Sequence, residues 1–466
     1  MSSAMLVNRE RANAASARLS TGMTEASNGV PDSSQLSYYA RYFGDPVSRL
    51  FWQGPELWMG ILPPYGSRFT DLMKSCVLDA VFAEHLIFGL EPVDEPIQGF
   101  DAVYRLDHTP RITYWHEWSP KMLRAATLRL FELLIELAER ALTLRNPHAW
   151  NLLFDGSRFS YANPGSVVPL EAETFAHSYE KIARFFVRPL LLLENGYEHM
   201  AHRLTADVRE GVLATDVRHL GCPWAHWSDQ SGEHSILSFL KEVFAKIESL
   251  LCNSTGYRWG NYFVTDCDFS PGSSWSRKEE TLEALLRDAR IHSVLDLGAN
   301  TGHYARLAAQ NGHEVIATDF DPALVDGIFE SVQQAGPSLY PAVLDFTHPT
   351  PGQGVDSSWF PPAAERLKSD LVLCFALVHH MTVGKYRLDF EQVARGVRSF
   401  SRGRVLFEYV GTERLRLNAN RPEAETWYTL ENMAETLRRH FPTVQILPPA
   451  KDGRCLLICG PNGGAA

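Results

Sequence analysis

Hydrophobic residues follow two different patterns along the chain, and the change between them falls near Trp275. Before that point, apolar residues recur at three- and four-residue steps, which is typical of amphipathic helices. After it, short apolar runs alternate with amphipathic stretches, which is typical of strands that alternate with helices. The two patterns predict a mainly helical N-terminal domain and a C-terminal α/β domain with a parallel, doubly wound sheet.

The segment that follows Ser119 gives the clearest helix of the N-terminal half. Ser119 suits an N-cap and Pro120 suits the first helical position, because proline lacks the N–H that would be left unpaired there. One face of this helix carries the apolar residues Met122, Leu123, Ala126, Leu130, Leu133, Leu134, Leu137 and Ala141. Two further apolar stretches, 182–193 and 236–251, are also expected to be helices.

Seven short apolar runs follow Trp275, and helical segments separate most of them. The runs are 293–297, 314–318, 340–344, 370–375, 404–408, 443–447 and 454–459. Alternation of this kind predicts a Rossmann-like sheet. The last two runs lie close together in the sequence, so we expect them to pair antiparallel.

The chain has 466 residues, more than one hydrophobic core usually organises, so two or three domains are expected. Residues 1–35 carry few large apolar side chains and are expected to be a disordered tail. The change of pattern divides the rest into domains at 36–270 and 275–466. Four aromatic residues just before the second domain are expected to form interdomain core or a pocket wall: Tyr257, Trp259, Tyr262 and Phe263.

The formal net charge is -11, and no dense Lys/Arg stripe is present, so we expect no nucleic-acid partner. No stretch reaches the roughly 18 apolar residues of a membrane span, so we expect no membrane partner and a cytoplasmic location. Seven cysteines lie scattered without metal-ligand spacing, which predicts reduced thiols and no metal site. The oligomeric state stays open.

The strongest motif is the run VLDLGANTGHY at 294–304, in which a strand leads through a turn into a helix. Gly298 and Gly302 let the backbone turn sharply and let a ligand approach without meeting a Cβ. Asn300 replaces the commoner central glycine, which suits a cofactor without a pyrophosphate. The motif therefore favours a nucleoside cofactor other than NAD.

Acidic residues also stand at the ends of the next two predicted strands. Asp319 follows Gly302 by about 17 residues, where a carboxylate can accept hydrogen bonds from two ribose hydroxyls. Asp345 and Phe346 end the third strand, where an acceptor and an aromatic face would meet an adenine. A glycine turn alone can occur by chance. Three acidic residues at the ends of successive predicted strands make a chance match much less plausible.

The glycine turn, Asp319, Asp345 and the strand at 370–375 resemble the motifs of class I S-adenosylmethionine (SAM)-dependent methyltransferases. The resemblance implies seven strands with the last one antiparallel. It also implies a SAM site in which Asp296 lies near the methionine amino group, Asp319 on the ribose and Asp345 at the adenine. The full expected cofactor set is Asp296, Gly298, Asn300, Gly302, Asp319, Asp345, Phe346 and Phe375. The chain also resembles a bacterial group of these enzymes that carries a helical N-terminal domain.

Two histidines, His379 and His380, follow the fourth strand on the edge where ligands bind in open α/β sheets. The spacing from Asp370 to His379 resembles that of plant-type small-molecule O-methyltransferases, whose histidine acts as a base. His379 or His380 would then take a proton from a hydroxyl acceptor, or both are structural. Glu408 ends the fifth strand and is expected to orient the base, bind a substrate amine or lie on the surface.

A segment in the N-terminal half, 144–165, faintly resembles the catalytic loop and metal-binding strand of kinase-like phosphotransferases. Asn151 stands in the place of the metal-binding asparagine. No aspartate occupies the base position, and Asn163 replaces the metal-binding aspartate. A simple hairpin with a turn at Asp155-Gly156 is the favoured interpretation.

Three functions fit these observations. The first is methylation of a small-molecule or carrier-bound acceptor, with the N-terminal domain covering the site and helping to select the substrate. The second is a protein or peptide methyltransferase whose N-terminal domain docks the partner. The third is a non-catalytic SAM-binding scaffold, which the intact cofactor motif disfavours.

Overall fold

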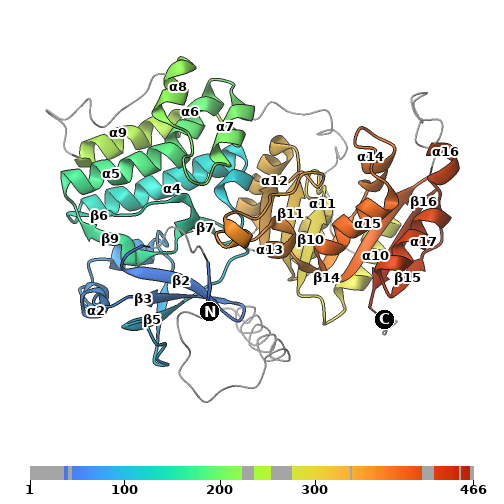
Figure 1. Ribbon diagram of the computed structural model, residues 1–466, viewed down its shortest axis with the longest axis horizontal. Coiled ribbons are helices and arrows are strands. Elements are labelled where there is room, and N and C mark those ends of the chain that lie inside the picture. The colour runs from blue at the N-terminus through green and yellow to red at the C-terminus, as the bar shows by residue number, and fades with distance from the viewer. Residues whose placement is uncertain are drawn as a thin grey trace.

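The computed structural model describes residues 36–39, 45–222, 236–252, 275–335, 338–411, 424–450 and 453–461. Figure 1 shows two parts side by side along the long axis, the N-terminal half in blue and green and the C-terminal half in yellow to red. The expected tail at 1–35 and the aromatic residues Tyr257, Trp259, Tyr262 and Phe263 lie outside the described residues.

The N-terminal half opens with a five-stranded antiparallel sheet of order β1-β2-β3-β5-β4. Its strands are β1 Ser37–Tyr38, β2 Ser48–Gln53, β3 Glu56–Ile61, β4 Leu90–Val93 and β5 Ala102–Leu106. The prediction of a mainly helical domain is wrong for this region. Its apolar runs are only four to six residues long and are joined by tight turns such as the one at Gly54, whose φ is 60°, and such runs suit strands better than helices.

Helices dominate the rest of the N-terminal half. They are α2 Gly66–Lys74, α3 Asp79–Ala83, α4 Pro120–Ala138, α5 Ala172–Ile182, α6 Arg188–Glu194, α7 Glu198–Thr205, α8 Ala214–His219 and α9 Ile236–Ser249. The helix predicted after Ser119 is α4, and its apolar face is buried as expected. Ala141 is the exception, because it lies beyond the end of the helix and is exposed. The stretch at 182–193 is helical too, with a π-helical turn at Ala183–Val187 that joins α5 to α6.

Two small antiparallel pairs lie between α4 and α5. β6 Leu142–Leu144 pairs with β9 Val167–Pro169, and β7 Leu152–Phe154 pairs with β8 Phe159–Tyr161. Single 3-10 turns flank these strands at Ala149–Asn151 and Pro164–Ser166, and another precedes α4 at Trp115–Glu117. The hairpin expected around Asp155-Gly156 is therefore confirmed, and Gly156 has a φ of 94°.

The C-terminal half is built on one seven-stranded sheet of order β12-β11-β10-β13-β14-β16-β15. The strands are β10 Ser293–Leu297, β11 Glu314–Asp319, β12 Leu339–Val343, β13 Ser369–Cys374, β14 Ser401–Val410, β15 Thr443–Ile446 and β16 Arg454–Gly460. β10 to β14 run parallel, while β16 runs antiparallel to both β14 and β15. The Rossmann-like α/β fold expected from the sequence is confirmed.

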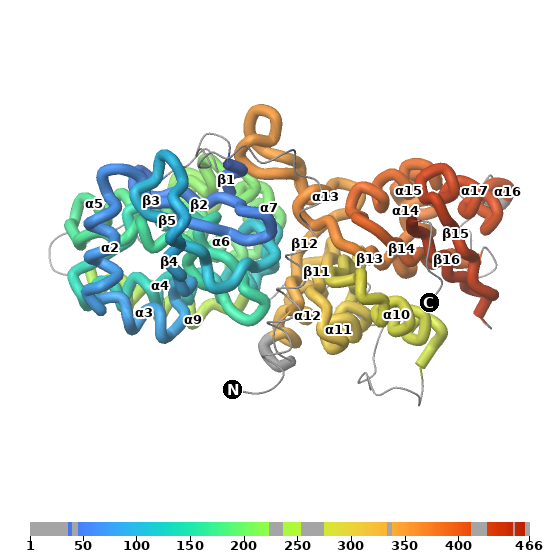
Figure 2. The backbone as a smooth tube through the Cα atoms, turned by 90° about the horizontal axis from the view of Figure 1, so that it is seen from below, coloured from blue at the N-terminus to red at the C-terminus, as the bar shows by residue number. Residues whose placement is uncertain are grey.

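Helices cover both faces of this sheet, as Figure 2 shows. α10 Arg277–Leu286, α11 His303–Gln310 and α12 Pro322–Ala335 lie on one side of the strands. α13 Ala363–Arg366, α14 Val378–Thr382, α15 Phe390–Ser399, α16 Ala424–Trp427 and α17 Leu430–His440 lie on the other side. A short 3-10 turn at Val355–Ser357 interrupts the crossing between β12 and β13.

Aromatic rings of the β7–β8 hairpin join the two halves at the outer strand β12 and at α12. Phe154 and Phe159 pack on Phe329, with ring centroids 5.7 and 6.3 Å apart. The Tyr340 hydroxyl on β12 donates to the carbonyl oxygen of Asp155 at 3.3 Å. The hydrophobic core consequently runs without a break from one half into the other.

A buried ion pair extends this junction. The guanidinium of Arg366 pairs with Glu117, donates to the Ile112 carbonyl oxygen at 2.6 Å and lies 4.3 Å from the ring centroid of Tyr114. Since Arg366 and Glu117 are both almost fully buried, each would carry an uncompensated charge without the other.

The described part of the chain has no helix that is both long and apolar enough to cross a bilayer. The six described cysteines are free thiols, and no group of three or more His, Cys, Asp or Glu side chains among the described residues is arranged to hold a metal.

Candidate active site

The turn between β10 and α11 has the open backbone that the sequence motif predicts. Gly298, Asn300 and Gly302 all have left-handed conformations, with φ of 72°, 53° and 77°. Asparagine tolerates this region better than most residues, which explains how Asn300 replaces a glycine. A Cβ on Gly302 would lie 2.9 Å from Ile328 of α12, whereas one on Gly298 would meet only Leu377 at 3.4 Å. Gly302 thus permits close helix packing, and Gly298 leaves space above the strand ends.

Two buried carboxylates face this turn from adjacent strands. Asp319 accepts backbone N–H groups from Asn300 at 2.9 Å and from Asp321 at 3.0 Å. Asp296 is 1% exposed, and its Oδ2 has no hydrogen-bond partner among the described residues. Burial, together with the charge of Asp319, raises the pKa of Asp296 to about 7, and burial raises the pKa of Asp319 to about 6. The site therefore holds acceptors that its own side chains leave unsatisfied.

The third acidic residue, Asp345, follows β12 and caps a local turn. Its Oδ1 accepts the backbone N–H of Thr347 at 2.8 Å and the hydroxyl at 2.6 Å. Phe346 packs toward α15, where its ring limits the space at Gly396 and lies 6.4 Å from the ring centroid of Phe400. Phe320, which the sequence analysis did not select, follows Asp319 directly and is 46% exposed.

Phe375, at the end of β13, belongs to a small group that also contains two unpredicted residues. Its ring centroid is 4.6 Å from that of Tyr304 in α11. The ammonium of Lys278, from α10, lies 5.3 Å from the Phe375 centroid and 5.5 Å from the Tyr304 centroid. A cation over two aromatic faces is a favourable arrangement. A lone lysine in the first turn of a helix gives no sequence signal of this placement.

Glu408 is fully buried beneath the strand ends, so it does not lie on the surface. Its carboxylate accepts the backbone N–H of Ala376 at 2.7 Å and pairs with Lys278 at 2.9 Å and Arg454 at 3.0 Å. Ala376 has a φ of 49°, which is strained for a residue with a Cβ. Glu408 therefore holds the turn that leads from β13 to His379.

His379 and His380 begin α14 with their ring centroids 4.0 Å apart. The Nδ1 atom of His379 is buried and has no hydrogen-bond partner among the described residues. Burial and the neighbouring charges of His380, Arg454 and Lys278 lower the pKa of His379 to about 3. The imidazole is neutral at physiological pH, but so low a pKa makes it a weak proton acceptor.

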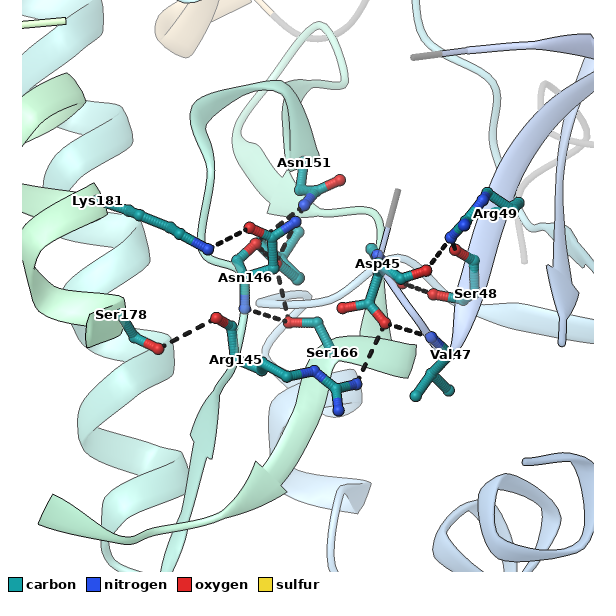
Figure 3. Close-up of polar contacts among 12 residues, drawn as sticks. Asp45, Val47, Ser48, Arg49, Arg145, Asn146, Asn151, Ser166, Ser178 and Lys181 are labelled. Carbon is teal, nitrogen blue, oxygen red and sulfur yellow. Dashed lines mark hydrogen bonds and ion pairs between the residues drawn. The ribbon is translucent and has the colours of Figure 1, made fainter. Parts of the chain in front are cut away.

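The kinase-like segment of the N-terminal half forms a different polar cluster, drawn in Figure 3. Asn151 donates to the Asn146 carbonyl oxygen at 3.1 Å, and Lys181 donates to the Asn146 side chain at 3.0 Å. Arg145 pairs with the buried Asp45 at 3.2 Å. The cluster thus consists of asparagines and an internal ion pair in place of metal-binding carboxylates.

Within the C-terminal half, the acids and the glycine turn stand at the carboxyl ends of parallel strands, and the strand order reverses beside β10. That combination of strand order, one antiparallel strand and strand-end acids decides the fold type. The C-terminal half has a Rossmann-like fold whose strand order and single antiparallel strand resemble those of class I methyltransferases.

Comparisons with known proteins found a sequence relative and solved structures of low similarity. No family model matches the chain. The chain is 25% identical to the nodulation protein NoeA of Rhizobium meliloti (strain 1021) over 306 residues. The match covers 59% of this chain and 63% of NoeA, so it spans less than two thirds of that relative.

Two solved structures show low similarity. Magnesium protoporphyrin IX methyltransferase (ChlM) from Synechocystis PCC 6803 with bound SAM is 12% identical, with 41% of this chain and 87% of that chain covered and a TM-score of 0.27. The bifunctional kinase-methyltransferase WbdD is 13% identical, with 40% and 39% covered and a TM-score of 0.30. The assignment of the methyltransferase fold rests on the strand order and directions.

Proposed function

We propose that the C-terminal half binds SAM and transfers its methyl group to a small-molecule or carrier-bound acceptor. The observation that carries the proposal is the pair of buried acids at the glycine turn. Asp296 has an oxygen without a partner among the described residues, and each Asp319 oxygen can accept further hydrogen bonds besides those from Asn300 and Asp321. A ligand that brings an ammonium group and hydroxyl donors would satisfy both acids.

The residues of the turn fit such a ligand in shape as well. Gly298 leaves room for an adenosine to approach the backbone, and Asp319 would accept hydrogen bonds from the ribose hydroxyls. Asp296 would face the amino group, and the exposed ring of Phe320 would offer a stacking surface for the base. Asp345 remains the proposed contact at the far side of the adenine.

SAM supplies an electrophilic methyl group, and the protein's task is then to hold an acceptor in line with it. Glu408 and the strained Ala376 fix the start of α14, so the imidazoles of His379 and His380 keep a constant position. If the acceptor is a hydroxyl, His379 is the proposed proton acceptor. Its depressed pKa favours instead an acceptor that arrives neutral, such as an amine, with His379 as a hydrogen-bonding neighbour.

A protein or peptide acceptor remains the second proposal, with the N-terminal half as the docking domain. The N-terminal half contacts β12, α12 and the segment that follows β12. These contacts form the junction through which the N-terminal half would influence the binding of an acceptor.

Titration calorimetry of the full chain with SAM and with S-adenosylhomocysteine tests the cofactor proposal. We expect binding of both with micromolar affinity, and the absence of binding to either would overturn the proposal. ADP serves as the control for non-specific nucleotide binding, because the turn offers acids where a phosphate would need N–H donors or cations.

The role of His379 is tested separately, by the rate of methyl transfer as a function of pH once an acceptor is known. With a pKa of about 3, His379 should give no rise in rate between pH 5 and pH 8. A rise with an apparent pKa near 6.5 that disappears in His379→Ala, together with a rate loss of about 10²–10⁴, would instead establish a histidine base.

A further inference from the structure

Three histidines of the N-terminal half, His116, His148 and His202, lie close to the buried Trp115. The ring centroids of His116 and His148 are 5.2 and 5.3 Å from that of Trp115. The Trp115 indole donates to the carbonyl oxygen of Thr205, which follows His202 by three residues in α7. His116 and His202 also line one small cavity of about 20 Å³. The three histidines are called the histidine cluster below.

The surroundings of the histidine cluster suit neutral imidazoles. Both ring nitrogens of His116 are buried and have no hydrogen-bond partner among the described residues. The Nδ1 atom of His148 accepts the backbone N–H of Trp150 at 3.4 Å, and only an unprotonated nitrogen can accept it. The cavity has room for about one water molecule, which is too little to hydrate an imidazolium fully.

Charged groups from three elements face His116. Glu117 is its neighbour in the 3-10 turn, Arg366 belongs to α13 and His202 to α7. Burial lowers the pKa of His116 to about 4; the charge of Glu117 opposes this shift, whereas those of Arg366 and His202 add to it. Glu117 already pairs with Arg366, so its charge is balanced before any proton reaches His116.

The other two imidazoles are also disfavoured as cations. Burial lowers the pKa of His148 well below its usual value, and Lys181 of α5 lowers it further. Burial and the neighbouring His199 lower the pKa of His202. Hydrogen bonds to the backbone oppose both shifts without cancelling them. Each proton that the histidine cluster takes up therefore destabilises the folded arrangement.

The histidine cluster also supports the segment that crosses from β12 to β13. Phe360 of this segment packs on Trp115, with ring centroids 5.9 Å apart. Arg366, which ends α13, pairs with Glu117, the residue directly after His116. β13 begins three residues after Arg366. A displacement of the turn that carries His116 would consequently loosen the segment that leads to the candidate site.

We propose that the histidine cluster is an acid-sensitive contact, which separates the 3-10 turn Trp115–Glu117 from α7 and loosens the crossing segment when it takes up protons. Opening would let water solvate the imidazolium rings. The pKa of His116 is lower in the folded chain than the usual value of about 6.5 in an unfolded chain. Its contribution to stability is therefore fully present above about pH 7 and is lost as the pH falls from about 6.5 towards 4.

Hydrogen exchange of the unmodified full chain at pH 7 and pH 5, corrected for the intrinsic exchange rate, tests the proposal directly. Protection of the backbone at 112–118 and 350–366 should fall about 10-fold or more at pH 5, while protection of β14 should change less than about twofold. Unchanged protection at 112–118, or an equal loss in β14, would overturn the proposal.

Urea unfolding of His116→Gln at the same two pH values isolates the titration of one imidazole, because the buried carboxylates titrate in both chains. From pH 7 to pH 5, the unfolding constant of the unmodified chain should rise about 20-fold relative to that of the variant. His177→Gln, at an exposed position of α5, is the matched control and should leave the pH dependence unchanged. The same pH dependence in His116→Gln as in the unmodified chain would overturn the role of His116. If that variant does not fold, the exchange measurement on the unmodified chain decides.

Discussion

The two polar clusters of this protein, one in each half, differ in whether a buried carboxylate has a cation partner. In both, burial raises the pKa of an aspartate, Asp45 or Asp296, and leaves one of its oxygens without a hydrogen-bond partner among the described residues. In the N-terminal cluster the buried Asp45 has an arginine partner, Arg145, and the surrounding asparagines bond to one another and to the backbone. At the glycine turn, burial raises the pKa of both Asp296 and Asp319, the charge of Asp319 raises the pKa of Asp296 further, and no ion pair with either is found among the described residues.

This difference supports the proposal that one cluster stabilises the fold and the other binds a ligand. An internal ion pair lowers the need for an outside partner, whereas like charges at one site are relieved by a bound cation or by hydrogen-bond donors. A sequence motif marks each of the two places, and the arrangement of charge in the structure tells them apart. The matched substitutions below exploit that contrast.

The largest expected effect comes from removing one acid of each cluster. Asp319→Ala should weaken SAM binding by about 1–3 kcal/mol, because the ribose loses charge-assisted hydrogen bonds. Asp45→Ala should leave the affinity unchanged and instead lower the free energy of unfolding by about 1–2 kcal/mol, since Arg145 is partly exposed and solvent screens it. Calorimetry and urea unfolding measure the two quantities. Unchanged affinity in Asp319→Ala would refute the placement of the ribose.

The next largest effect tests the backbone geometry of the glycine turn. Gly302→Ala should lower the free energy of unfolding by about 1–3 kcal/mol, because the new Cβ meets Ile328 in a left-handed backbone. Gly327→Ala, in α12 with open space around it, should stabilise the chain by up to about 1 kcal/mol. If thermal unfolding shows that both substitutions change the free energy of unfolding in the same direction, Gly302 is not constrained as described.

The smallest effect concerns pH. In the free protein the pKa of Asp296 is about 7, and a bound ammonium favours the ionised carboxylate, so binding expels a proton below that pH. Affinity for SAM should therefore rise about 10-fold from pH 6 to pH 8 and then level off. Asp296→Asn should flatten this rise in calorimetric titrations. A pH-independent affinity in the unmodified chain would contradict the contact between Asp296 and the ammonium.

The sequence predicted the C-terminal half far better than the N-terminal half. Parallel strands buried on both faces read as continuous apolar runs, so β10 begins and ends at the predicted residues and the other six runs overlap their strands closely. The N-terminal strands are short and aromatic-rich, and without strict alternation their pattern does not distinguish strand from helix.

Prediction of the candidate site from the sequence was limited in the same way. Asp296, Asp319 and the glycine turn follow from local sequence because a strand end fixes their position. Lys278, Tyr304 and Arg454 come to the site from α10, α11 and β16. No local sequence pattern predicts contacts between segments so far apart in the chain. Glu408 was expected to end its strand, but β14 continues to Val410, and the complete burial of Glu408 depends on β16 pairing beside it.

The junction along β12 has a consequence for how this protein can be divided. An excised C-terminal half would present Phe329 and Tyr340 to water, lose the partner of Arg366 and open a free strand edge at β12. The N-terminal half would expose Phe154 and Phe159 in turn. The two halves therefore form one folding unit. We expect that neither half can be expressed alone, or replaced by a homologous domain, without redesign of the surface that contacts the other.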